Sequence, residues 1–350
     1  MLDSLSFTDI TPRGASVILG LMIGLAFGAL AEATRFCLRR GLVGPLAERK
    51  PALSLWAVAL ATALIGTQAA VAAGWISFDG PRLLAPDLPI IAILIGGAAF
   101  GAGMVLTRGC ASRLTVLTGT GNLRALSVLV VFAIAAHATM KGLLAPLRTA
   151  LGSLTLPLGD AISLSALPGG ALLATAILAA AALAYAARNR LALRQIIAGI
   201  AIGGLVPLAW VGTGFVLADE FDPIAMESLS FTLPLSETLF WAIASSSVAA
   251  GFGIGLFGGT VAGAAISSLS FGRFGFQSFS SPAQTGRYAL GGALMGIGGV
   301  LAGGCTLGAG LAGVPTLSIA ALLALAAIAA GAITTDRVLA ANATPSPAFG

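Results

Sequence analysis

The sequence predicts an all-α, polytopic membrane protein of about nine transmembrane helices, and three observations lead to this prediction. First, 57% of the 350 residues are hydrophobic and only 9% are charged, whereas a soluble domain carries about 25% charged residues. Second, the mean hydropathy is +1.00. Third, apolar stretches of about twenty residues recur along the chain, and a helix of that length crosses a bilayer. Because these runs are continuous rather than alternating, a β-barrel is disfavoured, and a soluble globule is excluded.

Nine apolar segments are long enough to cross roughly 30 Å of hydrocarbon, and Pro, Gly, Asp and Arg fill the connections between them. The longest connections, Lys141–Leu167 and Ala218–Glu237, are too short for a separate folded domain. Residues 1–350 are therefore predicted to form a single membrane transport domain. The predicted spans are Ala15–Thr34, Ala52–Gly74, Leu88–Thr107, Arg124–Thr139, Pro168–Ala187, Gln195–Leu217, Thr238–Ile266, Tyr288–Gly303 and Thr316–Ile333.

The distribution of charge predicts the orientation of the chain. If odd-numbered spans run inwards, 14 of the 18 Lys and Arg residues lie on cytoplasmic connections, as the positive-inside rule requires. The N-terminus then lies outside and the C-terminus in the cytoplasm of a bacterial inner (cytoplasmic) membrane. The net charge of +5 is explained by this topology, so no nucleic-acid partner is expected. Charges expected on the outer face are Asp3, Asp9, Arg13, Asp79, Arg82, Asp87, Lys141, Arg148, Asp160, Asp219, Glu220, Asp222, Glu227 and Glu237.

The chain contains an internal repeat. Gly96–Cys110 and Gly291–Cys305 agree at nine of fifteen positions, including both terminal cysteines, and Gly20–Gly28 weakly resembles Gly251–Gly259. Two related halves are predicted, over about residues 14–140 and 196–335, as in many transport folds. In the first half an extra predicted crossing, Ala52–Gly74, separates the Gly20–Gly28 segment from the cysteine motif, whereas the second half has none at the corresponding place. If every segment crossed fully, the two pairs of related segments could not have the same relative orientation. The Gly-rich cysteine segments are therefore predicted to re-enter the membrane, which glycine makes possible inside protein.

The three cysteines, Cys37, Cys110 and Cys305, each lie at a predicted helix interruption. Their spacing predicts neither a disulfide framework, nor a zinc site, nor a proximal pair for thiol exchange. Backbone N–H groups at a broken helix attract anions, and a neutral thiol is a weak donor for a soft sulfur anion. A free thiol has a pKa of about 8.5 and is mostly neutral at pH 7. The alternative is that each cysteine is only a small buried hydrophobe.

Several nearby residues extend the candidate site. Gly109, Gly304 and Thr306 adjoin the cysteines and are predicted to contribute to substrate binding. Arg35, Arg108 and Arg113 are candidates for guiding an anion, although membrane anchoring explains them equally well.

Two charged pairs lie at helical spacing. Glu32 is three and seven residues before Arg35 and Arg39, which predicts a pair on one helix face. His137 and Lys141 lie one turn apart, which favours helix packing and interface anchoring over a proton-linked role.

At these motifs the sequence resembles the YeeE/YedE family of membrane proteins, whose characterised members include thiosulfate transporters. The resemblance implies an hourglass-shaped bundle of about nine helices with re-entrant segments, in which cysteines relay thiosulfate; here they are Cys37, Cys110 and Cys305. The order Leu114-Thr115 departs from the Thr-Leu of the family pattern. The resemblance rests on the blocks Arg35–Arg39, Phe100–Leu126, Gly204–Gly214 and Gly291–Gly313.

The function expected from the sequence is uptake of thiosulfate, without enzymatic activity, a catalytic residue, a cofactor or a metal. The family's association with sulfur-handling proteins suggests a cytoplasmic sulfurtransferase as a partner that consumes the product. Three alternatives remain open at this point: transport of a selenium or other reduced-sulfur species, a membrane thiol oxidoreductase, and a structural membrane subunit.

Overall fold

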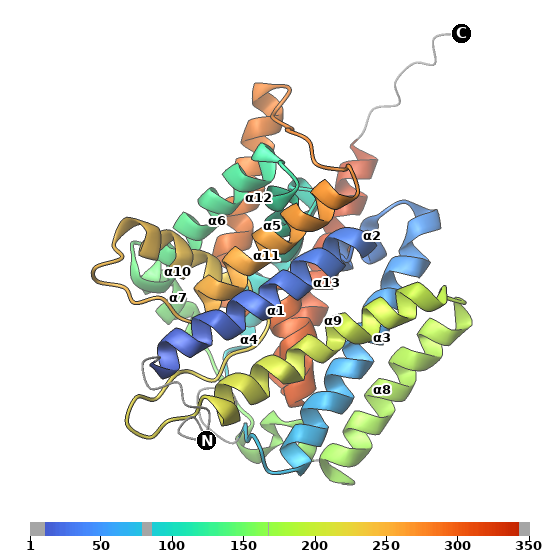
Figure 1. Ribbon diagram of the computed structural model, residues 1–350, viewed down its shortest axis with the longest axis vertical. Helices are drawn as coiled ribbons and strands as arrows, with labels where there is room; N and C mark the ends of the chain where they lie inside the picture. The colour runs from blue at the N-terminus through green and yellow to red at the C-terminus, as the bar shows by residue number, and fades with distance from the viewer. Residues whose placement is uncertain (1–10, 79–85, 167, 343–350) are drawn as a thin grey trace.

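The computed structural model describes residues 11–78, 86–166 and 168–342. Within these ranges the chain forms a bundle of tilted helices (Figure 1), together with one two-stranded ribbon in which Asp87 pairs with Pro157. Nine segments in the described part of the chain are long and apolar enough to cross a membrane. The predicted all-α, polytopic membrane class is thus confirmed.

The elements follow in chain order. They are α1 (Pro12–Thr34), α2 (Leu38–Val43), α3 (Leu46–Ala72), β1 (Asp87–Leu88), α4 (Ile90–Leu106), α5 (Ala111–Gly119), α6 (Leu123–Lys141), α7 (Ala145–Gly152), β2 (Leu156–Pro157), η2 (Gly159–Ile162), η3 (Leu164–Ala166), α8 (Gly170–Arg188), α9 (Leu193–Val211), η4 (Gly212–Val216), α10 (Thr232–Ile243), α11 (Phe252–Ser270), α12 (Pro282–Leu301), η5 (Thr306–Gly313), η6 (Val314–Thr316) and α13 (Ile319–Ala341).

Glycines set the closest helix contacts and show how the helices run. A Cβ atom on Gly20 of α1 would overlap the α11 backbone at Phe252, and one on Gly28 would overlap it at Thr260. The two helices therefore run parallel and in backbone contact, side by side in Figure 1. Small residues permit this approach, which is how membrane helices gain packing energy without a hydrophobic driving force.

Further glycine contacts give the relative directions of four more helix pairs. By the same comparison α4 runs parallel to α13 and antiparallel to α12, α6 runs parallel to α12, and α3 runs parallel to α9. Every one of these directions agrees with nine crossings that alternate.

The Gly–Cys segments lie at helix breaks inside two of the candidate spans, and their re-entry stays a prediction. Residues Ile90–Gly119 form one interrupted span, made of α4 and α5, and Pro282–Thr316 form another. Just beyond α5, Asn122 donates a hydrogen bond to Gln277 in the α11–α12 connection at 3.0 Å. This contact places the end of the first interrupted span at the face where α11 ends and α12 begins.

One predicted span is wrong. The segment Thr238–Ile266 was expected to cross as one helix, but α10 ends at Ile243 and α11 begins at Phe252. The gap, residues 244–251, contains three consecutive serines and ends at Gly251. Serine competes for backbone hydrogen bonds and glycine lowers helix propensity, so the apolar character of this stretch does not make it one helix.

The bundle has two faces of different charge. The connections after α1, α5, α8 and α11, together with the end of α13, lie on one side of the bundle, which we call the basic face. We call the opposite side the acidic face. Figure 1 shows the first turn of α1 and the last turn of α13 at opposite ends of the bundle. The expected residues Asp3, Asp9, Asp79 and Arg82 lie outside the described ranges. The basic face carries Arg35, Arg39, Arg40, Arg49, Lys50, Arg108, Arg113, Arg124, Arg188, Arg190, Arg194, Arg273, Arg287 and Arg337.

Two adjacent glycines of α11 test this packing. A Cβ atom on Gly259 would overlap the carbonyl oxygen of Leu21 in α1, whereas one on Gly258 would meet nothing within 4 Å. We expect Gly259→Ala to lower stability by about 1–3 kcal/mol through overpacking, and Gly258→Ala to leave it unchanged or slightly higher. Thermal unfolding of the two purified variants measures the difference. Equal melting temperatures would contradict the close α1–α11 contact.

Candidate functional site

The three cysteines lie in one recurring backbone motif. Each follows a long helix that ends in a left-handed residue two positions before the cysteine: Arg35 with φ 55°, Arg108 with φ 58° and Gly303 with φ 75°. Each cysteine is then extended and begins a short helical segment, namely α2, α5 or η5. The first-turn N–H groups of these segments are the donors that a helix leaves unpaired. The left-handed backbone conformation is unfavourable for arginine, so the surrounding packing must hold Arg35 and Arg108 in it.

The breaks converge in the protein interior. Cys37, Cys110 and Cys305 have exposed fractions of 8%, 1% and 0%, and all three belong to the main hydrophobic core. The side chains of Cys37 and Cys110 are close enough to interact with each other. The expectation of no proximal cysteine pair is therefore wrong, because the spacing in sequence conceals how the interruptions meet. None of the three forms a disulfide.

Cys110 is the centre of the cluster. Its Sγ lies 3.4 Å from the Ser112 hydroxyl, and the Thr306 hydroxyl also contacts it. Because Thr306 is the neighbour of Cys305 in the chain, the two Gly–Cys segments meet at this point. Thr306, predicted from its position in the motif, thus lies between two cysteines.

Cys305 has polar neighbours of its own. Its Sγ accepts a hydrogen bond from the Gly308 N–H at 3.4 Å, and the Phe231 backbone also contacts it. The Ser230 side chain packs against Gly308. The connection before α10 therefore reaches the cysteine from the acidic face.

The two predicted glycines have different places. The Gly109 carbonyl accepts a hydrogen bond from the Thr107 hydroxyl at 2.9 Å, and the same hydroxyl donates to the Gly103 carbonyl in α4. This fixes the end of α4 against the break. Gly304 lines a cavity on the acidic face.

Only one of the three predicted guiding arginines is beside the cysteines. Arg113 donates from Nη1 to the Ala31 carbonyl of α1 at 3.3 Å and interacts electrostatically with Cys37 and Cys110. Arg35 and Arg108 are exposed on the basic face.

Glu32 has partners other than those expected. Its Oε2 accepts hydrogen bonds from Ser267 at 2.7 Å and from Arg273 at 2.9 Å. The predicted pairing with Arg35 or Arg39 is wrong, because α1 ends at Thr34 and Arg35 leaves the helix face. The resulting ion pair instead ties α1 to the end of α11.

A cavity of about 430 Å³ on the acidic face is lined by Gly303 and Gly304, and we call it the outer cavity. Two cations, Lys141 and Arg148, and two hydroxyls, Ser230 and Thr232, contribute to its wall. No sequence motif marks these hydroxyls, because Ser230 lies just before α10 and Thr232 is its first residue. The full lining is Met140, Lys141, Arg148, Ser230, Thr232, Leu233, Gly299, Val300, Gly303 and Gly304.

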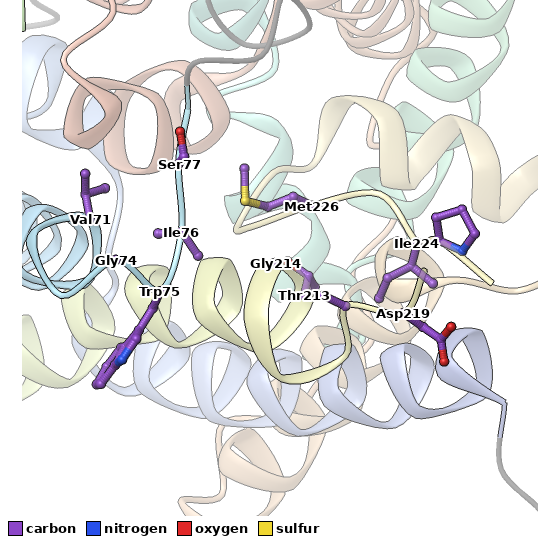
Figure 2. Close-up of a pocket in the computed structure, with 12 residues that line it drawn as sticks. Val71, Gly74, Trp75, Ile76, Ser77, Thr213, Gly214, Asp219, Ile224 and Met226 are labelled. Atoms are coloured by element: carbon purple, nitrogen blue, oxygen red, sulfur yellow. The ribbon is translucent and has the colours of Figure 1, made fainter. Parts of the chain in front are cut away.

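Another hollow, of about 490 Å³, lies between the end of α3 and the segment after α9. Figure 2 shows Ile76 and Met226 on either side of it, with Trp75 turned away and Asp219 at its edge. The Asp219 carboxylate accepts backbone hydrogen bonds from Phe221 and Asp222 at 2.7 and 3.2 Å. The Asp219 carboxylate at its edge makes this hollow a poor anion site.

His137 has a packing role. Its ring stacks on Phe240 with centroids 3.5 Å apart, and Nδ1 lies 3.2 Å from the Ser236 hydroxyl. Among the residues with described positions, no group of three or more His, Cys, Asp or Glu side chains could hold a metal.

Comparison with known proteins assigns the chain to a family. The model of the family described as "Sulphur transport" matches residues 33–334, which include all three cysteine motifs. The chain belongs to this sulphur transport family.

Two relatives of this sulphur transport protein are named as transporters. This chain is 26% identical over 321 residues to the thiosulfate transporter TsuA of Spirochaeta thermophila, and the match covers 87% of this chain and 93% of the relative. This chain is also 24% identical over 319 residues to the thiosulfate transporter TsuA of Escherichia coli, and the match covers 84% of this chain and 86% of the relative. These names support a transporter rather than an enzyme.

The contact between Cys37 and Cys110 predicts a specific cross-link. We expect diamide to oxidise these two thiols, which lose two electrons and two protons to the reagent, and to leave Cys305 free. A disulfide requires Cα atoms about 4.4–6.8 Å apart, and Cys37 and Cys110 are the two cysteines whose side chains interact directly. Mass spectrometry of peptides from the full chain identifies the bond, and Cys37→Ser is the control that must remove it. A cross-link to Cys305 in place of Cys37 would contradict the arrangement.

Proposed function

We propose that this member of the sulphur transport family takes up thiosulfate across the bacterial inner membrane, and that Cys305, Cys110 and Cys37 bind the anion in turn. The observation that carries the proposal is the convergence of three buried cysteines at the starts of short helical segments. The names of both relatives, thiosulfate transporters, support thiosulfate as the cargo. No covalent bond to the anion is required.

The chemistry of the cluster suits a soft anion. A neutral thiol can donate a weak hydrogen bond to sulfur or oxygen, and backbone N–H groups at the start of a helical segment add partial positive charge. Each contact is weak, so the ion can leave as readily as it arrives, which conduction through successive sites requires. Fully charged partners at each step would hold it too tightly.

The proposed path crosses from the acidic face to the basic face. The anion first meets the Gly303–Gly304 segment and Cys305, then passes Thr306 to Cys110. Cys37 receives it next, beside the positively charged Arg113. Arg35 and Arg108, exposed on the basic face, are proposed to guide the anion as it leaves.

The orientation follows from the same charges. We infer that the basic face is cytoplasmic, because Lys and Arg are enriched on that side of inner-membrane proteins. A dianion moving inwards opposes the membrane potential by about 2.3 kcal/mol per charge for each 100 mV, or about 4.6 kcal/mol in total. Consumption of the product by a cytoplasmic sulfurtransferase would supply a gradient to offset this.

Replacement of the relay thiols tests the proposal. In cells without other importers, Cys110→Ala and Cys305→Ala should each abolish uptake of labelled thiosulfate, because a methyl group cannot donate to the anion. The matched control is Ser268→Ala, which removes a fully buried hydroxyl that donates only to the Ala265 carbonyl of its own helix. Protein levels in the membrane are measured for all three variants.

Two outcomes would reject the relay or change its cargo. Near-normal uptake by either cysteine variant at normal protein levels would reject it. Inhibition of uptake by selenium or other reduced-sulfur anions at lower concentration than unlabelled thiosulfate would assign a different cargo to the same path.

A further inference from the structure

Helix α8 lies at the edge of the bundle and is held by protein mainly along one half. Figure 1 shows it at that edge, joined to α9 by a short connection. Its main contacts are with α3 and η3. In the half nearer the acidic face, Ala171, Ala174 and Leu178 pack against a buried cluster that includes Leu64 and Leu317. The half nearer the basic face has a different environment.

An open groove borders that second half of α8, and we call it the α8 groove. Helices α8 and α9 both pack along α3 but have few contacts with each other, so α3 forms the floor between them. The groove has a volume of about 460 Å³. Ile65 of α3, Leu183 of α8 and Ile200 of α9 line it and are 51%, 44% and 49% exposed. The groove is therefore open to the hydrocarbon of the bilayer.

The lining of the α8 groove is apolar along its length and basic at one end. The Thr62 hydroxyl in its floor donates to the Val58 carbonyl of its own helix at 3.0 Å, so this donor is already used. Arg190 is the one charged residue among the described residues that line the groove. An apolar slot that ends in a cation fits a molecule with an apolar tail and an anionic head.

The basic end of the groove has a concentration of positive charge. Arg188 in the last turn of α8, Arg190 in the connection and Arg194 in the first turn of α9 are all exposed. None of the three forms an ion pair with a carboxylate in the described ranges. No side chain caps the start of α9 at Leu193, so the N–H groups of its first turn add partial positive charge. This charge attracts anionic headgroups at the membrane surface.

The direction of the groove matches that of a lipid chain. It runs from Arg190 at the basic face towards Ile65, and its floor from Val58 to Ile65 is about 10 Å long at 1.5 Å per residue. A lipid acyl chain extends in the same sense, from the headgroup level towards the bilayer centre. A phosphate at Arg190 thus places the chain along the floor of the groove.

We propose that the α8 groove binds an acyl chain of one anionic phospholipid, whose phosphate lies at Arg190 and is flanked by Arg188 and Arg194. Guanidinium groups donate charge-assisted hydrogen bonds to phosphate oxygens. A zwitterionic lipid, whose headgroup has no net charge, gains less from the three cations. The bound chain fills the space between α8 and α9 and completes the packing of the half of α8 that protein leaves open.

Native mass spectrometry of the purified full-length chain measures this lipid directly. Dioleoyl phosphatidylglycerol should be retained as one lipid per chain, about fivefold or more tightly than dioleoyl phosphatidylcholine. Arg190→Gln should weaken phosphatidylglycerol binding about fivefold, which is the effect of one cation near the membrane surface. The matched control is Arg337→Gln, which removes an exposed cation of the basic face at the end of α13. It should bind phosphatidylglycerol within twofold of the unchanged protein.

Two further variants test the groove itself. Ala187→Phe fills it with an aromatic ring, whereas Ala181→Phe places the same ring at an exposed position of α8 outside the lining. Both should melt close to the unchanged protein before lipid is added, which checks folding. Added phosphatidylglycerol should then raise the melting temperature of the unchanged protein and of Ala181→Phe by several degrees, and that of Ala187→Phe little.

Four results would overturn the proposal. These are equal retention of the two lipids, unchanged phosphatidylglycerol binding by Arg190→Gln, an equal melting shift in the two phenylalanine variants, and a dimer that Ala187→Phe dissociates. The last result would assign the groove to a second copy of the chain. Lipid retention is measured without substrate, so it is independent of thiosulfate transport.

Discussion

Interruption of helices inside the bilayer is the constraint on which the structure depends. A helix that stops in the hydrocarbon layer exposes backbone N–H and C=O groups that lipid cannot satisfy, so a break survives only when protein surrounds it. The three breaks at Cys37, Cys110 and Cys305 meet this condition, because the cysteines are buried in the main core. The freed N–H groups are then available to a ligand, and a thiol stands at the start of each short segment.

Glycine makes that enclosure possible. The contacts of α1 with α11 and of α4 with α12 and α13 bring backbone against backbone, at positions where even a methyl group would overlap the neighbour. Helices this close leave little room for lipid or water between them. The same residues that pack the bundle therefore create the dry interior in which weak thiol and N–H donors act without competition from water.

Much of the fold could be predicted from the sequence, because membrane spans are specified locally. Hydropathy located most helices, and the repeated Gly–Cys motif indicated that Cys110 and Cys305 belong together. The span at Thr238–Ile266 failed because hydropathy does not report the effect of its serines on the backbone. The contact of Cys37 with Cys110, the Glu32–Arg273 ion pair and the cavity at Ser230 and Thr232 depend on tertiary packing between distant segments. No local pattern contains that information.

The central claim is that polarizable, uncharged thiols at helix breaks pass a soft anion across the membrane. The most direct measurement compares thiosulfate flux through the purified chain in liposomes with flux through Cys110→Ser, in which a hydroxyl donor replaces the thiol at nearly the same position. The account predicts that the serine variant folds, retains its melting temperature within a few degrees and loses most of the flux. A serine variant that transports at the rate of the unaltered protein would contradict it, because a hydrogen-bond donor alone would then suffice.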